Sequence, residues 1–140
     1  MGEVIVAANE TGWRPDEFEI CIGGCFGPTF TVRLKEGNLT YESSPGMYAL
    51  AVIEEIAPDR DAWVVFWDEL DAVGVWSWKA LYDNPAAEGT HWFVHIAKGE
   101  RFIKSEGENA YPGSDGLEPT EAFERFLEAL RMLLGGVDFW

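Results

Sequence analysis

Residues 74–112 read GVWSWKALYDNPAAEGTHWFVHIAKGERFIKSEGENAYP and lie between the two segments with the clearest helical pattern. This stretch contains three of the seven tryptophans, both histidines and two of the four tyrosines. Trp92, Val94 and Ile96 alternate with polar or aromatic neighbours, which is typical of a half-buried β-strand. We therefore predict a strand at 90–97, a turn at 98–100, a returning strand at 101–105 and a polar loop at 106–116.

The segment before this stretch shows the same alternation three more times. Phe18, Ile20 and Ile22 recur at every second position, and two similar runs follow after glycine-containing turns. Alternating runs joined by short turns predict an antiparallel meander with one solvated face. The predicted strands are 18–22, 29–35, 39–42 and 47–56, together with a short strand at 2–8.

Two segments have the period of an amphipathic helix. Asp59 is a suitable N-cap for the first, and Gly74 stands where a left-handed residue would end it. Pro119 and Thr120 begin the second, which Gly135 ends. Apolar residues recur at helical spacing in both, at positions 63, 66, 67, 70 and 73 and at 123, 126, 127, 130 and 134. The apolar tail at 137–140 is expected to pack on the body.

These elements predict one α+β domain over residues 1–140, because 140 residues are the size of a single domain. We expect an antiparallel sheet of about five to seven strands with both helices packed on one face. The pattern Val32-x-Leu34-x-x-Gly37 returns as Val94-x-Ile96-x-x-Gly99, and the two helical stripes also align. This similarity suggests a duplicated hairpin-plus-helix unit.

The charge balance limits the classes of partner. The chain has 25 acidic and 10 basic residues, a formal net charge of −15. Nucleic-acid backbones and anionic membranes would repel such a protein, so we expect it to bind neither, whereas a basic protein partner is compatible with it. Acidity that only keeps an aromatic-rich domain soluble is the simpler alternative. With no recognisable targeting segment or membrane span, a cytoplasmic location is expected.

Two cysteines and two histidines are a ligand set that zinc can use, but their spacing in the sequence argues against a zinc site. Cys21 and Cys25, and likewise His91 and His95, are four positions apart. Residues four apart on a strand are separated by about 13 Å, too far for two ligands of one zinc ion. Cys25 as a nucleophile is a second hypothesis, but an inert, buried thiol is the better interpretation. We therefore expect no metal, no cofactor and no catalytic residue.

The remaining aromatic and polar residues of the opening stretch form the candidate site. Trp76 and Trp92 are expected to complete the core. The rest combine apolar rings with polar tips, as recognition surfaces do, although a well-packed loop cluster would have the same composition. The candidate partner-binding residues are Trp78, Lys79, Tyr82, Asn84, Asn109 and Tyr111.

These residues favour a non-catalytic protein-interaction domain that recognises a partner protein through an aromatic patch, and the acidic charge favours a basic partner. The alternative is a small-molecule-binding domain or enzyme. It would use a cleft between the segment from Gly23 to Pro28 and the segment from Asn109 to Pro112.

The same stretch resembles a family of small, functionally uncharacterised bacterial domains. The similarity covers most of residues 20–134 and rests on GVWSWK at 74–79, Tyr82-x-Asn84-Pro85, Gly89-Thr90-x-Trp92 and Ser105-x-Gly107-x-Asn109-Ala110-Tyr111-Pro112. The resemblance implies a compact α+β domain and transfers no catalytic residue. The chain departs from the pattern at His91, where the family is expected to have Gln or a similar residue.

Overall fold

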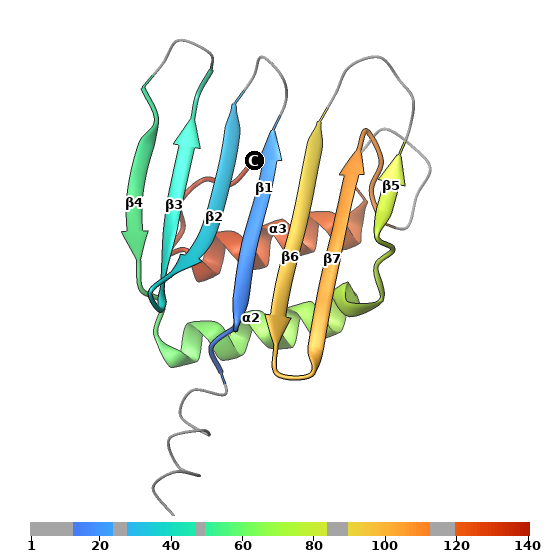
Figure 1. Ribbon diagram of the computed structural model, residues 1–140, viewed down its shortest axis with the longest axis horizontal. Helices are drawn as coiled ribbons and strands as arrows, with labels where there is room; N and C mark the ends of the chain where they lie inside the picture. The colour runs from blue at the N-terminus through green and yellow to red at the C-terminus, as the bar shows by residue number, and fades with distance from the viewer. Residues whose placement is uncertain (1–12, 24–27, 47–49, 84–89, 113–119) are drawn as a thin grey trace, which may run out of the picture.

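The computed structural model describes residues 13–23, 28–46, 50–83, 90–112 and 120–140. These residues form a seven-stranded sheet and two α-helices (Figure 1), so the predicted α+β class is confirmed. The strands are β1 (Glu17–Gly23), β2 (Thr29–Lys35), β3 (Asn38–Ser44), β4 (Val52–Ile56), β5 (Leu81–Asp83), β6 (His91–Lys98) and β7 (Arg101–Glu108). The helices are α2 (Arg60–Val73) and α3 (Glu121–Leu133), with a 3-10 turn, η1 (Val75–Ser77), after α2.

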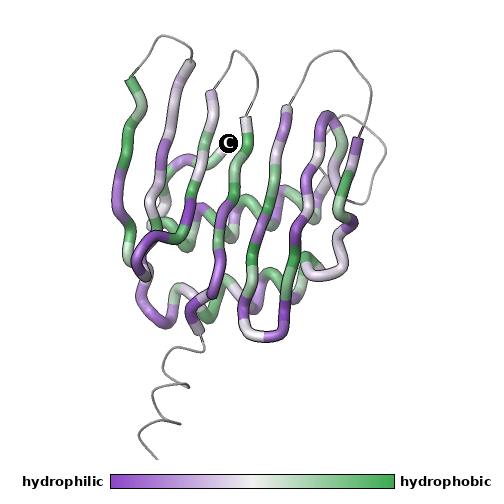
Figure 2. The backbone as a smooth tube through the Cα atoms, viewed as in Figure 1, coloured by the Kyte–Doolittle hydropathy of each residue, from purple (hydrophilic) through white to green (hydrophobic). Residues whose placement is uncertain are grey.

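Strand β1 is the centre of the sheet, whose order is β4-β3-β2-β1-β6-β7-β5. Ile20 of β1 pairs with Val32 of β2 on one side and with Val94 of β6 on the other. All three side chains are buried, and a slip by one residue would turn the apolar face of β1 toward water. The alternation seen in the sequence therefore fixes the register (Figure 2).

The sheet is mixed rather than purely antiparallel, which corrects the sequence prediction. Five strand pairs are antiparallel, but β5 runs parallel to β7. The predicted loop at 106–116 also begins too early, because Glu106 to Glu108 complete β7 and pair with β5. Strand β4 begins at Val52 instead of residue 47. The predicted strand at 2–8 lies outside the described residues.

The capping residues inferred from the sequence have the predicted roles. The Asp59 carboxylate accepts a hydrogen bond from the Ala62 amide at 2.8 Å, and the Thr120 hydroxyl accepts one from the Phe123 amide at 3.3 Å. Gly74 has φ 74°, and its amide donates to the Leu70 carbonyl at 3.1 Å. These contacts satisfy backbone groups that the helix ends leave without intrahelical partners.

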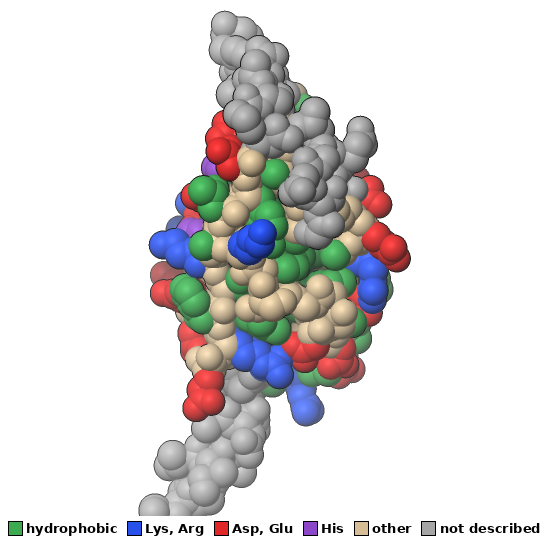
Figure 3. Space-filling view, turned by 90° about the vertical axis from the view of Figure 1, so that its right-hand side faces the viewer, with side chains coloured by type: hydrophobic (Ala, Val, Ile, Leu, Met, Phe, Trp, Pro, Cys, Tyr) green, Lys and Arg blue, Asp and Glu red, His purple; other side chains and the backbone are tan. Residues whose placement is uncertain are grey.

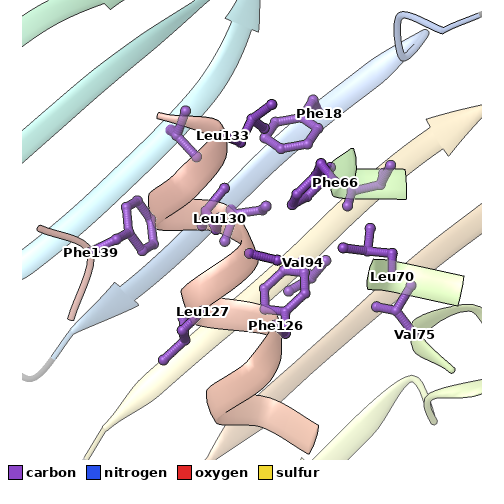
Figure 4. Packing of buried hydrophobic residues seen from close by; sticks show 14 of the residues in the cluster. Phe18, Phe66, Leu70, Val75, Val94, Phe126, Leu127, Leu130, Leu133 and Phe139 are labelled. Atoms are coloured by element: carbon purple, nitrogen blue, oxygen red, sulfur yellow. The ribbon is translucent and has the colours of Figure 1, made fainter. Parts of the chain in front are cut away.

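The core lies between the sheet and the helices, which are both drawn behind the strands in Figure 1. The Phe18 ring of β1 lies 5.4 Å from that of Trp63 in α2, and the Trp92 ring of β6 lies 4.9 Å from that of Phe123 in α3. Phe66 of α2 and Phe126 of α3, whose rings are 6.5 Å apart, both belong to the buried cluster shown in Figure 4. Each helix therefore uses its predicted apolar stripe.

The suggested duplication is not consistent with the strand arrangement. Hairpins β2–β3 and β6–β7 both begin next to β1, and β2 and β6 are both antiparallel to it. Both bury the same face, since Val32 and Val94 each pair with Ile20. However, β3 lies on one side of this centre and β7 on the other. The two hairpins are thus related like mirror images, and no rotation superposes them.

The C-terminal tail packs on the body, as expected. Phe139 is fully buried, and its ring lies 5.7 Å from that of Phe30 in β2. The Tyr41 hydroxyl donates a 2.6 Å hydrogen bond to the Asp138 carbonyl. The tail therefore covers the part of the sheet formed by β2 and β3.

We predict that Phe139→Ala lowers the free energy of unfolding by about 3–5 kcal/mol, because it removes a buried ring and leaves a cavity. Trp140→Ala is the matched control, since Trp140 is 41% exposed and its loss should change stability by less than about 1 kcal/mol. Urea denaturation followed by tryptophan fluorescence or circular dichroism measures both. If both variants lost the same free energy of unfolding, the packing of the tail on the sheet would not depend on Phe139.

Candidate functional site

Residues 74–79 turn the chain from α2 to the edge of the sheet. Gly74 ends the helix, and the amides of Ser77 and Trp78 donate to the carbonyls of Gly74 and Val75, at 3.1 Å each. The Val75 side chain is fully buried. This tight turn places Trp78 next to the core and leaves Lys79 exposed.

Trp78, the first candidate binding residue, is half-buried and packs against the core. Its ring lies 5.4 Å from that of Phe126, 6.0 Å from that of Trp92 and 6.1 Å from that of Phe123. A side chain with three aromatic neighbours from β6 and α3 stabilises the fold. Of the ring of Trp78, only the part that the core leaves uncovered is available to a partner.

Strand β5 follows directly and is held to β7 by backbone and side-chain contacts. The Glu106 amide donates to the Ala80 carbonyl at 3.0 Å. The Ser105 hydroxyl, on a residue that is only 1% exposed, donates to the Lys79 carbonyl at 2.5 Å. These bonds fix residues 79–83 along β7, although no alternation in the sequence indicates a strand there.

Lys79 and Tyr82 contact each other at this edge. The Lys79 amide donates to the Tyr82 hydroxyl at 2.9 Å, and the Lys79 ammonium lies 5.9 Å from the Tyr82 ring centroid. The other side of Tyr82 packs on Trp92 at 6.0 Å between ring centroids. Tyr82 is thus half-buried between the core and the exposed Lys79.

Asn109 and Tyr111, two further candidate partner-binding residues, are buried. They are 5% and 3% exposed. Asn109 has φ 57°, and its amide donates to the Thr90 carbonyl at 2.9 Å. The Tyr111 ring stacks with that of Trp92 and lies 4.9 Å from that of Phe123. Asn84, the remaining candidate, lies outside the described residues.

Trp92 is the common neighbour of the three aromatic candidates, Trp78, Tyr82 and Tyr111. Its indole nitrogen donates a buried 2.9 Å hydrogen bond to the Ala110 carbonyl. Gly107 lies beside this bond: a Cβ there would lie 2.5 Å from the Ala110 oxygen and closer still to the indole nitrogen. The small residue at position 107 therefore makes room for the indole and its acceptor.

What remains accessible is the β5 edge, which we define as residues 79–83. Leu81 is 58% exposed, and Lys79, Ala80 and Asp83 are exposed as well. Leu81 pairs with Glu106 and Asp83 with Glu108, so carboxylates border the strand. Figure 3 views the molecule from this side and shows hydrophobic side chains gathered near the centre of the face, with acidic ones toward its margins.

The outer side of β5 carries backbone groups that no strand of the described residues pairs with. Since Ala80 accepts from β7, the neighbouring Leu81 directs its N–H and C=O away from β7 in a parallel ladder. No described strand pairs with that outer side of β5. An edge of this kind is a template for a further strand.

The alternative cleft is described only in part, because residues 24–27 lie outside the described ranges. Gly23 and Glu108 both pair with His91, from opposite sides of β6. The two segments proposed to form the cleft therefore begin on opposite sides of β6. Two strand spacings separate these starting points, a distance of about 10 Å. Three depressions lined by described residues lie elsewhere, on the open sheet face, beside the β6–β7 turn and between the helices.

The cysteine and histidine residues are far from a metal-binding arrangement where the structure describes them. His91 and His95 lie in β6, in extended chain, and the His91 imidazole is 3.9 Å from the Glu106 carboxylate. Cys21 is half-buried and accepts a 3.5 Å hydrogen bond from the Thr31 hydroxyl. The described residues contain no cluster of three or more potential metal ligands. Cys25 lies outside them.

Comparison with known proteins gives no relative from which to transfer a function. The chain matches no protein-family model and no curated protein. The resemblance noted from the sequence therefore stays a prediction. Within the described residues, no helix is long and apolar enough to cross a membrane.

We predict that Gly107→Ala destabilises the protein by about 1–3 kcal/mol, because the added methyl group overpacks the space between Trp92 and Ala110. Gly46→Ala is the matched control, since a Cβ at Gly46 meets no atom within 4 Å. Thermal unfolding compares the two variants. Similar melting temperatures for both would mean that the Trp92 indole does not require a glycine at position 107.

Proposed function

We propose that this domain is a non-catalytic protein-interaction module that recognises a basic, extended segment of a partner protein at the β5 edge. The observation that carries the proposal is the outer side of β5, which pairs with no strand in the described part of the chain and where Leu81 is 58% exposed between carboxylates. An extended segment added to a sheet edge gains backbone hydrogen bonds and places alternate side chains on the edge.

The charge supports a basic partner. Asp83, Glu106 and Glu108 surround the exposed leucine, and the chain as a whole carries a formal charge of −15. Opposite charge steers association and favours the correct partner over acidic competitors. Lys79 is the nearest cation, and its ammonium is directed at the Tyr82 ring. The cytoplasm, expected from the sequence, is the compartment in which we place this recognition.

The fold supports a role in binding because it holds the edge rigidly. We place both helices on one face of the sheet. On that face Trp78 and Tyr82 pack against Trp92, and this packing holds β5 in position. A strand with fixed partners loses little conformational freedom when it binds, which favours affinity. Lys79, Leu81 and Tyr82 are the residues that we assign to partner contact.

We predict that Leu81→Pro weakens partner binding at least tenfold without unfolding the domain. Proline removes the N–H that points away from β7 and leaves the bonds to β7 in place. The probe is a fluorescein-labelled ten-residue peptide in which Lys alternates with Val or Thr, and fluorescence anisotropy measures its affinity. Binding should also weaken as salt concentration rises.

Two controls make this test specific. Phe102→Ala removes a side chain that is also 58% exposed, but from β7, and should leave binding unchanged. A peptide with Glu in place of Lys should bind at least tenfold more weakly. Equal affinity for both peptides, or an undiminished affinity of a folded Leu81→Pro variant, would contradict the proposed function.

A further inference from the structure

A groove runs along the outer side of the molecule between the two helices. The helices are antiparallel here, since the start of α2 lies beside the end of α3 and Glu69 pairs with Arg125. The groove encloses about 290 Å³, and its lining is apolar except for Asp61 and Glu69. Val65 and Phe66 form the α2 side of the groove, and Met132 and Leu133 form the α3 side.

Two side chains of the groove are exposed and lie outside the hydrophobic core cluster. Val65 is 50% exposed and Met132 is 64% exposed, although both helices already bury a separate stripe in the core. Valine is an unfavourable residue on an exposed helix surface, because its branched side chain loses rotamer freedom there. Methionine is flexible and adapts to varied apolar partners. Both residues therefore suit contact with another molecule.

The charges around the groove are predominantly acidic. Asp61 and Glu69 lie in its lining, and Glu128 is four residues before Met132 and thus on the same side of α3. Arg125 is the cation at this face, and its guanidinium lies 3.2 Å from the Glu69 carboxylate. A second copy of this chain, with the same charge of −15, would be repelled. A basic partner would be attracted.

Backbone hydrogen bonding decides the conformation of the partner. The residues that line the groove belong to helices, whose backbone groups are bonded within each helix. An extended segment placed there would find no backbone partners for its own N–H and C=O groups. A helix satisfies these groups internally and presents one apolar stripe to the groove.

We propose that the α2–α3 groove docks a basic amphipathic helix of a partner protein, with apolar anchors at helical spacing seated against Val65 and Met132. This mode is the helix-in-groove type of recognition. The surface is separate from the β5 edge and goes beyond the function proposed there. Either surface can fail its test while the other passes.

The test uses the full chain and a labelled 18-residue peptide of Leu and Lys, with leucines at i, i+3, i+4 and i+7 in each repeat. A peptide of the same composition with leucines spread around the helix is the control. We expect at least tenfold tighter binding of the amphipathic peptide by fluorescence anisotropy. Circular dichroism should show the bound peptide gaining helix.

Met132→Glu should reduce that affinity at least tenfold, because it places a charge in the apolar groove. Val65→Ser is a milder second variant and should weaken binding several-fold. Phe102→Glu is the matched control on β7, where a side chain of similar exposure should be replaceable without effect. Leu81→Pro should also leave this interaction unchanged, which separates it from the β5 edge.

Three results would overturn the proposal. The first is equal affinity for both peptides. The second is undiminished binding by folded Met132→Glu and Val65→Ser variants. The third is self-association in sedimentation experiments that Met132→Glu abolishes, which would assign the groove to a second copy of the chain.

Discussion

The buried hydrogen bond from the Trp92 indole to the Ala110 carbonyl is the constraint on which one end of the molecule depends. An indole N–H removed from water must find an acceptor, and its partner here lies 18 residues further along the chain. To supply that acceptor, the chain leaves β7, adopts a positive φ at Asn109 and returns beneath the ring. Gly107 provides the space for this approach.

The same ring determines what the β5 edge exposes. Trp78, Tyr82 and Tyr111 all contact Trp92, so the aromatic residues of this region are directed inward. Leu81, between them in sequence, is directed outward because side chains alternate along a strand. Leu81, which is not part of the core, is therefore the centre of the candidate binding surface, and Lys79 and Tyr82 lie at its margin.

The predictability of the fold follows from the length and period of each segment. Strands β1, β2 and β6 alternate over seven or eight residues, and Asp59, Gly74 and Thr120 satisfy helix ends, so these elements were predicted correctly. Strand β5 has only three residues and no period, and its pairing depends on contacts with β7 that are distant in sequence. The parallel pair, and therefore the mixed sheet, was missed.

The candidate site was harder to predict for a different physical reason. Composition does not distinguish an aromatic residue that faces a partner from one that faces another ring. The buried positions at the end of β7 are Ser105 and Gly107, which are small or polar, so the apolar alternation of a strand is lost there. The sequence therefore predicted a loop that included Asn109 and Tyr111. A larger side chain at Gly107 would meet Trp92, and the Ser105 hydroxyl is used by the backbone carbonyl of Lys79. Leu81, by contrast, had no feature in the sequence that set it apart.

The central position of β1 has a consequence for how the chain folds. One neighbour, β2, follows it closely in the sequence, but the other, β6, pairs Val94 with Ile20 across about half of the chain. Closing so long a loop costs conformational entropy before any contact repays it. During synthesis the segments that form β1–β4 therefore emerge before the β6 partner of β1, and one edge of β1 lacks this partner until residues 91–98 have left the ribosome. The centre of the finished sheet is thus formed by two strands that are far apart in the sequence.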